Sequence, residues 1–560
     1  MRPETDAMEK NKETLNEYIS ASIREHWDLP SLTDMNGTTF LYRDVARKIA
    51  KLHLLFEHIG IERGDKIALC GRNSAGWCVA YLATVTYGAV IVPILNEFKA
   101  DNIHHLVNHS DARLLFVDRN TWENLDPALM GHLKGSLLIA DFSLLHSNSP
   151  ELNDARAHLN EYFGQRFPDR FTRDDVQYAQ VPLETLALIS YTSGSTGFSK
   201  GVMLSHRVLW SNVQYCIDQL TLIEACDGIV SMLPLAHMYG MMVDFLYGIS
   251  VGAHLHFLTR TPSPRVIIEA FAKVRPKMIV SVPLILEKII KTRVFPLLDK
   301  PLMKILMHVP FVDERLLNKI KAQLQDTFGG RLKEIIIGGA GLNHDVEVFL
   351  RRIGFPYTAG YGMTECGPLI SYAHAKDIRL QSCGRAVDRM QLRIASSDGG
   401  YMVPGVLWVR GDNVMDGYYK NPEATEAVLK DGWLNTGDIC RIDPDGFLYI
   451  RGRDKNMILG PSGQNIYPEE IEQKLNNLPY VSESIIIEEK GQLTALVYPD
   501  IDNARAQGIT MDTLIGMMDE NLVQLNREIP AYCRVSRVRV YNEEFEKTPK
   551  KSIKRYLYQR

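Results

Sequence analysis

Residues 191–201, with the sequence YTSGSTGFSKG, combine the groups that a protein needs to hold a phosphate. Glycines let backbone amides turn toward one anion, hydroxyl side chains add donors, and a lysine adds positive charge. The segment follows the apolar run 186–190, and its spacing differs from the Walker A pattern G-x4-G-K-[ST]. We therefore predict a phosphate-binding turn after a buried strand, with a flexible Ser/Gly linker as the alternative. The predicted phosphate ligands are Thr192, Ser193, Gly194, Ser195, Thr196, Gly197 and Lys200.

A second group of candidate ligands is the segment YGMTE at residues 361–365. Tyr361 offers a flat surface suited to adenine, Thr364 a hydroxyl for a phosphate, and Glu365 a hard carboxylate for Mg²⁺. Taken alone, a Tyr and a Glu in a loop are more often ordinary surface residues. The segment therefore needs support from its surroundings.

Two charged residues in the last third of the chain could complete a nucleotide site. Asp438 closes the segment Thr-Gly-Asp, where a loop carboxylate can accept both hydroxyls of a ribose. Arg453, fifteen residues later, could bind phosphate or ribose oxygens with its planar fork. The alternatives are an Asx turn at Asp438 and a surface ion pair at Arg453.

Small residues and a histidine mark two further loops. Gly338, Gly339 and Ala340 follow the apolar run 335–337, so a ligand could approach the backbone closely at that strand end. His237 lies in the loop LPLAHMYG, and a lone histidine is more often structural than catalytic.

Seven segments in this order resemble the motifs of the adenylate-forming superfamily of acyl-CoA synthetases, luciferases and peptide-synthetase adenylation domains. The resemblance covers most of the chain, and seven matches in the family's order exceed chance. The segments are TSGSTGFSKG (192–201), LPLAHMYG (233–240), GGAGL (338–342), YGMTE (361–365), RGDNVMDGYYKNPEAT (410–425), DGWLNTGD (431–438) and GRDKN (452–456).

The resemblance implies a role for each candidate. It implies that Tyr361 stacks on adenine, that Thr364 contacts the α-phosphate, and that Asp438 binds the ribose. It also implies that Glu365, together with Thr192, holds Mg²⁺. The segment with Gly338, Gly339 and Ala340 would border both the adenine and the acyl group, and Gly362 would belong to the ATP site. His237 would line the acyl-carboxylate and thiol region.

The implied reaction joins two anions, a carboxylate and the α-phosphate of ATP, so its main need is charge neutralisation with correct positioning. Mg²⁺, Lys200 and a C-terminal lysine would supply the positive charge. In the family, a small C-terminal domain then rotates so that the thiol of CoA reaches the acyl group. We therefore expect an N-terminal adenylate-forming domain over residues 1–452 and a mobile lid domain over 453–560, with the hinge near Lys455.

The tail departs from the family pattern T-P-x-G-K-I-x-R. This chain has TPKKSIKR at residues 548–555, which places Ser552 where the catalytic lysine belongs. A neutral hydroxyl cannot replace an ammonium beside a phosphate. Lys551 is the best substitute, and Lys550 and Lys554 are weaker candidates. The alternative is a basic tail with no catalytic lysine, which would make the chain a nucleotide-binding regulatory protein without adenylation activity.

The motifs say less about which acid is the substrate. The stretch 456–472 and the tail near residues 545–556 look most like bacterial long-chain fatty acid–CoA ligases, so a fatty acid is the leading expectation. Asp244, seven residues after His237, leaves open an amino acid activator, which needs a buried acidic partner for the ammonium. A stand-alone ligase that delivers its acyl group to acyl carrier protein is a further alternative.

Repeated strand–helix units must position these motifs. Apolar runs of strand length occur at residues 66–70, 114–117, 186–190, 278–282 and 335–337. One helix, at residues 102–108, could be capped by Asp101 and leads directly into the strand at 113–118. Such units indicate an α/β fold, with mainly parallel sheets flanked by helices in the large N-terminal domain. A small α+β C-terminal module is expected, with a helix at 468–478 and strands at 484–488 and 493–498.

Bulk properties narrow the partners and the compartment. The chain has 560 residues, 45% of them hydrophobic and 23% charged, with a formal net charge of −4, which argues against nucleic acid as an obligatory partner. Its eight cysteines are scattered, and no secretory signal is visible at the start, so we expect a cytoplasmic protein. The uncharged stretch 75–94 is broken by Gly88 and Pro93, which favours a buried helix and strand over a membrane span. The sequence leaves open a homodimer and a peripheral membrane contact.

Overall fold

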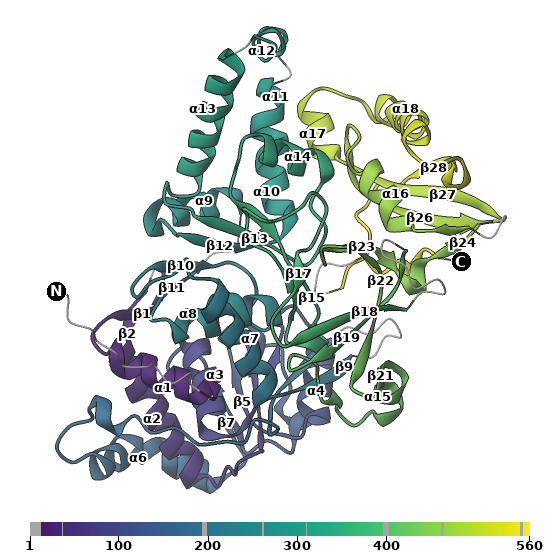
Figure 1. Ribbon diagram of the computed structural model, residues 1–560. Helices are drawn as coiled ribbons and strands as arrows, with labels where there is room; N and C mark the ends of the chain where they lie inside the picture. Colours follow the sequence, from purple (N-terminus) through teal and green to yellow (C-terminus); the bar gives the residue numbers. More distant parts are fainter. Residues whose placement is uncertain are drawn as a thin grey trace.

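The computed structural model describes residues 13–35, 37–192, 199–259, 263–298, 300–309, 311–395, 403–460, 464–548 and 553–559. It has an α/β fold with a large N-terminal domain and a smaller C-terminal domain (Figure 1). The C-terminal part, drawn in yellow-green and yellow, lies beside α14 (His344–Arg352) and over the strands that end the N-terminal part.

An eight-stranded sheet forms the centre of the N-terminal domain. Five neighbouring strands, β8, β4, β3, β5 and β6, run parallel, and antiparallel strands close both edges. The predicted strands in this sheet are confirmed. In spatial order the strands are β20 (Gly417–Tyr418), β9 (Lys200–Ser205), β8 (Leu186–Thr192), β4 (Val90–Ile94), β3 (Lys66–Cys70), β5 (Ala112–Val117), β6 (Gly135–Leu138) and β7 (Leu144–Ser147).

The uncharged stretch at residues 75–94 is core, as predicted. It forms the fully buried helix α3 (Ala75–Tyr87), a left-handed turn at Gly88 with φ +89°, and the strand β4. Within the described ranges, no helix is both long enough and apolar enough to cross a membrane. The other helices around this sheet are α1 (Leu15–Glu25), α2 (Tyr42–His58), α4 (Ala100–His109), α5 (Arg119–Trp122), α6 (Pro150–Arg166), α7 (His206–Gln219) and α8 (Tyr247–Ser250).

The predicted cap of α4 is wrong. The helix begins at Ala100 with Lys99 at the N-cap position, so Asp101 lies inside its first turn. An acidic side chain there still interacts favourably with the helix dipole, which explains why the sequence pattern resembles a cap.

Two smaller sheets complete the α/β layers. One has the order β10 (Gly228–Ser231), β11 (His254–Phe257), β1 (Pro30–Asp34) and β2 (Thr39–Leu41). The other is fully parallel, with β12 (Met278–Ser281), β13 (Glu334–Ile337) and β14 (Tyr357–Ala359). The helices around it are α9 (Pro264–Val274), α10 (Pro283–Ile289), α11 (Phe295–Leu298), α12 (Pro301–Leu306), α13 (Val312–Thr327) and α14.

Antiparallel strands then lead toward the C-terminal domain. One sheet contains β15 (Tyr361–Gly362), β16 (Leu369–Tyr372) and β17 (Arg385–Ala386). The next contains β18 (Met390–Ala395), β19 (Gly405–Gly411), β22 (Trp433–Ile442), β21 (Leu429–Lys430) and β23 (Leu448–Arg453), with α15 (Pro422–Val428) beside them. Their alternating burial is typical of sheets with one wetter face.

The C-terminal module has its own apolar core, centred on Leu475, Ile486 and Leu525. Its predicted helix and two strands are present, although the helix ends three residues early, at Leu475. In chain order the elements are β24 (Ile458–Leu459), β25 (Asn465–Ile466), α16 (Pro468–Leu475), β26 (Val481–Glu489), β27 (Gln492–Pro499), α17 (Ile501–Ala506), α18 (Met511–Glu528) and β28 (Val535–Val540).

Candidate active site

The Ser/Thr/Gly-rich segment connects two antiparallel strands. β8 and β9 pair from Leu186–Ser205 to Thr192–Lys200, with a register shift between Leu186 and Leu188, so the segment joins two paired strands. Thr192 and Lys200 therefore lie opposite each other at the end of this strand pair. Ser193, Gly194, Ser195, Thr196 and Gly197 lie outside the described residues, and their phosphate contacts stay a prediction.

Tyr418 joins the predicted phosphate lysine to the predicted metal ligand. The ammonium of Lys200 lies 4.8 Å from the centroid of the Tyr418 ring, within cation–π range. The hydroxyl of the same tyrosine donates a hydrogen bond to Oε1 of Glu365 at 3.0 Å. β20 holds Tyr418 in place by pairing with β9, opposite Val202. Lys200 and Glu365, which are far apart in the sequence, thus both contact the Tyr418 side chain.

The sequence analysis quoted the motif that contains Tyr418 but gave this residue no role. The available signal was its place in the segment RGDNVMDGYYKNPEAT, next to a glycine. Gly417 has φ +135°, and a Cβ there would lie 2.9 Å from Cγ2 of Thr425. The backbone before Tyr418 therefore requires glycine.

The surroundings of Glu365 fit a magnesium ion. Glu365 is half-buried on a short 3-10 helix, Thr364–Cys366, and its backbone oxygen accepts a hydrogen bond from Met415. Oε1 is held by Tyr418, whereas Oε2 has no hydrogen-bond partner among the described residues. Mg²⁺ takes one or two carboxylates and completes its shell with phosphate oxygens and water. A single oriented carboxylate is therefore the donor set expected of a nucleotide-bound metal.

A second cluster brings together Tyr361, Asp438 and Arg453. The Tyr361 hydroxyl donates to Oδ2 of Asp438 at 2.5 Å, and Nε of Arg453 lies 2.8 Å from Oδ1. β22 and β23 create this arrangement, because Asp438 and Arg453 are directly paired across them. Burial raises the pKa of Asp438, and the Arg453 guanidinium opposes that shift. The structure thus assembles the three residues predicted to bind adenine, ribose and phosphate.

The loops with His237 and with the strand-end glycines also meet. Tyr239 donates a hydrogen bond from its hydroxyl to the backbone oxygen of Ile336 at 3.0 Å. A Cβ on Gly338 would lie 2.9 Å from Cζ of Tyr239, so glycine permits this contact. Nδ1 of His237 accepts a hydrogen bond from the Tyr239 backbone at 3.3 Å. Exposed Gly339 and Ala340 follow on the same strand end.

Two protein-family profiles match the chain. The profile of the AMP-binding enzyme family matches residues 19–419, and that of the AMP-binding enzyme C-terminal domain matches residues 455–560. The chain belongs to the AMP-binding enzyme family.

Relatives of this AMP-binding enzyme include a long-chain-fatty-acid–CoA ligase, FadD15, of Mycobacterium bovis. It is 25% identical over 573 residues, which cover 94% of this chain and 91% of the relative. Among solved structures, the anthranilate CoA ligase AuaEII in complex with anthranoyl-AMP has a TM-score of 0.78 at 17% identity, covering 97% and 96% of the two chains. O-succinylbenzoate CoA synthetase of Bacillus subtilis with ATP and magnesium has a TM-score of 0.72 at 19% identity, covering 96% and 98%.

The C-terminal module of the AMP-binding enzyme docks beside the strand-end glycines. Nε2 of Gln473, on α16, bonds to Oε1 of Gln381 at 3.0 Å and to the backbone oxygen of Leu342 at 3.2 Å. Asn343 and Asn477 are also hydrogen-bonded across this boundary. Exposed Lys455 lies in the three-residue 3-10 helix Asp454–Asn456, between β23 and the module.

Three cations of the basic tail form ion pairs within the C-terminal module. Lys547 pairs with Glu483 and Glu544, and Arg555 with Glu472. Lys554, the weaker catalytic candidate, pairs with Glu546 at 2.8 Å. All three cations are thus held by carboxylates of their own module. Lys550, Lys551 and Ser552 lie outside the described residues, so the catalytic role of Lys551 stays a prediction.

Asp244 is buried in the π-helix Gly240–Leu246, and neither carboxylate oxygen has a partner among the described residues. Burial raises its pKa well above the ordinary range. An ammonium beside this carboxyl would favour its ionised form, so a buried Asp244 without a partner in the described part of the chain is compatible with an amino acid substrate. The amino acid activator therefore stays an alternative.

Proposed function

We propose that this protein is a ligase that uses ATP and Mg²⁺ to convert a fatty acid to an acyl-adenylate and then to an acyl-CoA thioester. The observation that carries the proposal is the convergence on Tyr418, where Lys200 and Glu365 meet. The cluster of Tyr361, Asp438 and Arg453 supplies a matching nucleoside site. The name of the mycobacterial relative supports a long-chain fatty acid as the substrate.

In the first step, a carboxylate oxygen of the acid attacks the α-phosphorus and the bond to the bridging oxygen of the β-phosphate breaks. Pyrophosphate leaves with the bonding electrons. Lys200 offsets the charge that builds on the phosphate oxygens, and Glu365 and Thr192 would hold a magnesium ion that supplies further positive charge. Thr364, buried beside Glu365, orients the α-phosphate, and Lys551 is the proposed second ammonium.

In the second step, the thiol sulfur attacks the acyl carbon and AMP leaves as the carbon–oxygen bond breaks. The thiol loses its proton to solvent. For CoA to reach this carbon, we propose that the C-terminal domain, residues 453–560, rotates about Lys455. The short connection Asp454–Asn456 contains no buried residue, which is what a hinge requires.

A cavity at the edge of the central sheet suits the nucleotide part of CoA. It has a volume of about 490 Å³ and is lined by Arg72 and Lys99, among others. It opens at the carboxyl ends of β3, β4 and β5, where the strand order reverses, the usual ligand position in such sheets.

The decisive test follows both half-reactions with a panel of acids from acetate to stearate and several aryl acids. We expect pyrophosphate exchange into ATP with long-chain acids, and AMP release with CoA. Release with acyl carrier protein but not CoA would favour the stand-alone acyl-AMP ligase. Nucleotide binding without exchange for any acid would favour the regulatory alternative.

A further inference from the structure

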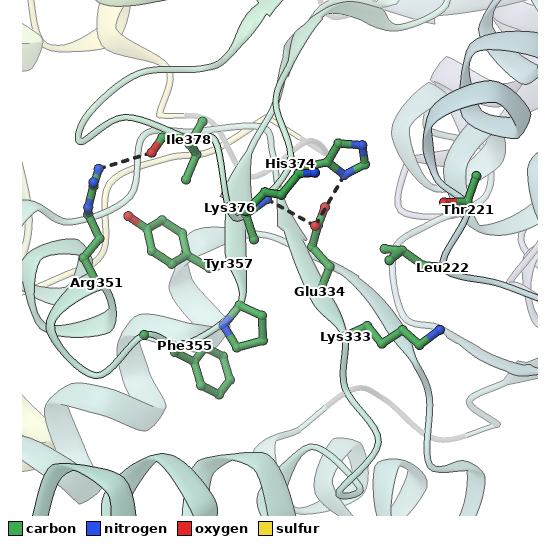
Figure 2. A pocket seen from close by; sticks show the side chains of 13 residues that line it. Thr221, Leu222, Lys333, Glu334, Arg351, Phe355, Tyr357, His374, Lys376 and Ile378 are labelled. Carbon is green, nitrogen blue, oxygen red and sulfur yellow. Dashed lines mark hydrogen bonds and ion pairs between the residues drawn. The ribbon is translucent and has the colours of Figure 1, made fainter. Parts of the chain in front are cut away.

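A separate cavity lies at the opposite end of the β12–β13–β14 sheet from the nucleotide motifs (Figure 2). Its volume is about 640 Å³, in the range of small-molecule sites. Lys333 and Tyr357, at the amino ends of β13 and β14, line it. The carboxyl ends of the same two strands lead to Gly338 and Tyr361. Because parallel strands place like ends together, the cavity and the nucleotide motifs occupy opposite edges of one sheet.

The cavity is lined by an excess of positive charge. Lys333, Arg351 and Lys376 surround it from three different segments, as Figure 2 shows. All three residues are exposed, and no ion pair joins any of them to a carboxylate among the described residues. Arg351 uses one nitrogen, Nη1, to bond to the backbone oxygen of Ile378 at 3.2 Å. Among the described residues, no protein group accepts a hydrogen bond from the other guanidinium nitrogens of Arg351.

The acidic residue in the wall, Glu334, does not neutralise these cations. Its side chain is buried and accepts hydrogen bonds from the Tyr372 hydroxyl and from the Ala375 backbone, the latter at 3.2 Å. Nδ1 of His374 lies 3.6 Å from the same carboxylate. Glu334 therefore fixes the loop that carries His374 and Lys376, so that this wall is ordered before any ligand arrives.

We propose that this cavity binds a small phosphate monoester of about the size of a sugar phosphate. Two ammonium groups and a guanidinium can match the charge of close to −2 and the several acceptor oxygens of a phosphate. Apolar side chains on the wall, Leu222 and Phe355, suit the organic part. The site is independent of the acyl-transfer proposal, since none of its lining residues belongs to the nucleotide motifs.

Occupancy of the cavity has a route to the C-terminal domain. The Tyr357 hydroxyl donates to Oε1 of Glu347 at 3.0 Å, and Glu347 accepts the backbone N–H of Gln381 at 3.1 Å. Gln381 in turn receives the side-chain hydrogen bond of Gln473, on α16. A ligand that binds the cavity more tightly when these hydrogen bonds are formed would therefore favour the docked position of the C-terminal domain.

The test is ligand binding to the full-length protein. Isothermal titration and thermal unfolding are measured with glycerol 3-phosphate and glucose 6-phosphate, and with glycerol and glucose as uncharged counterparts. The double variant Lys333→Gln/Lys376→Gln removes two cations of the cavity. The matched control, Lys430→Gln/Lys490→Gln, makes the same charge change at exposed positions on β21 and in the β26–β27 turn.

We expect at least one phosphate probe to bind and raise the Tm while its uncharged counterpart does not. In the cavity variant its Kd should increase at least tenfold, and in the control it should change less than twofold. Screening of the exposed cations should also weaken binding at high salt. No binding of either phosphate probe would overturn the proposal. Equal binding to the wild type and the cavity variant would also overturn it, because the phosphate would then bind elsewhere, for example in the nucleotide site.

Discussion

The two halves of the proposed nucleotide site are built differently. In the phosphate half, the Tyr418 side chain contacts both the Lys200 ammonium and the Glu365 carboxylate. The ammonium and the second carboxylate oxygen stay available for a ligand. In the nucleoside half, Tyr361, Asp438 and Arg453 are already bonded to one another. A site for chemistry needs groups that respond to developing charge, whereas a recognition site gains from groups fixed in advance. We therefore expect variants in the phosphate half to lower kcat and variants in the nucleoside half to raise the KM for ATP.

The largest effect is expected from replacing Lys551, the proposed catalytic lysine of the tail. Lys551→Ala should lower acyl-adenylate formation about 10²–10³-fold, because a charge-stabilising donor is lost in the transition state. Thioester formation from supplied acyl-adenylate and CoA should fall less than tenfold. Rapid-quench measurement of the two half-reactions separates the effects, with Lys550→Ala as the neighbouring control. Equal losses in both half-reactions would remove the proposed role of Lys551.

Glu365→Gln tests the metal side of the phosphate half. The neutral amide should lower turnover about 10²-fold at limiting Mg²⁺, with partial recovery at high Mg²⁺. Folding stability should change little, since Glu365 is only half-buried. The measurement is a Mg²⁺ titration of AMP release, with exposed Glu426→Gln as the control. Unchanged turnover at limiting Mg²⁺ would place the metal elsewhere.

Asp438→Asn addresses the nucleoside half. Loss of a charged acceptor should raise the KM for ATP about 10–100-fold, the cost of one or two charge-assisted hydrogen bonds, with a smaller change in kcat. Steady-state kinetics with varied ATP check this. A variant with normal KM and reduced kcat would contradict the division between the two halves.

Tyr418→Phe and Tyr419→Phe form a matched pair. Phenylalanine at 418 keeps a ring beside Lys200 but loses the hydrogen bond to Glu365, so we expect about a tenfold loss of kcat and a shifted Mg²⁺ dependence. The Tyr419 hydroxyl instead bonds to exposed Asp111, and its removal should have little effect. Equal kinetics for both variants would show that Tyr418 does not orient the carboxylate.

The smallest effect on activity is expected from Asp244→Asn, which changes stability. An unfolded aspartate ionises near pH 4, whereas burial raises the pKa of Asp244, so its ionisation favours unfolding as pH rises above about 4. The amide removes this penalty. The advantage of the variant in free energy of unfolding should therefore grow from pH 5 to pH 8 by at least about 1 kcal/mol, the scale of one pKa unit, and it is followed through the Tm. Exposed Asp174→Asn is the control, and a constant Tm difference across pH would contradict the buried-acid interpretation.

The sequence by itself determined the central strands, the buried helix α3 and the order of the nucleotide motifs. Local apolar runs and glycine positions decide these features, and they are legible without knowing what each segment contacts. It also singled out Tyr361, Asp438 and Arg453 individually. The α4 cap was misread because an acidic residue in a first turn and a cap residue leave the same pattern.

Only the tertiary structure decided which of these residues meet. The register of β22 against β23 sets Asp438 beside Arg453, and the pairing of β20 with β9 sets Tyr418 between Lys200 and Glu365. The basic cavity near Lys333 likewise collects residues from segments that are far apart in the chain. The physical reason is that strand register and loop packing depend on interactions across the whole sheet, which no local stretch of sequence encodes.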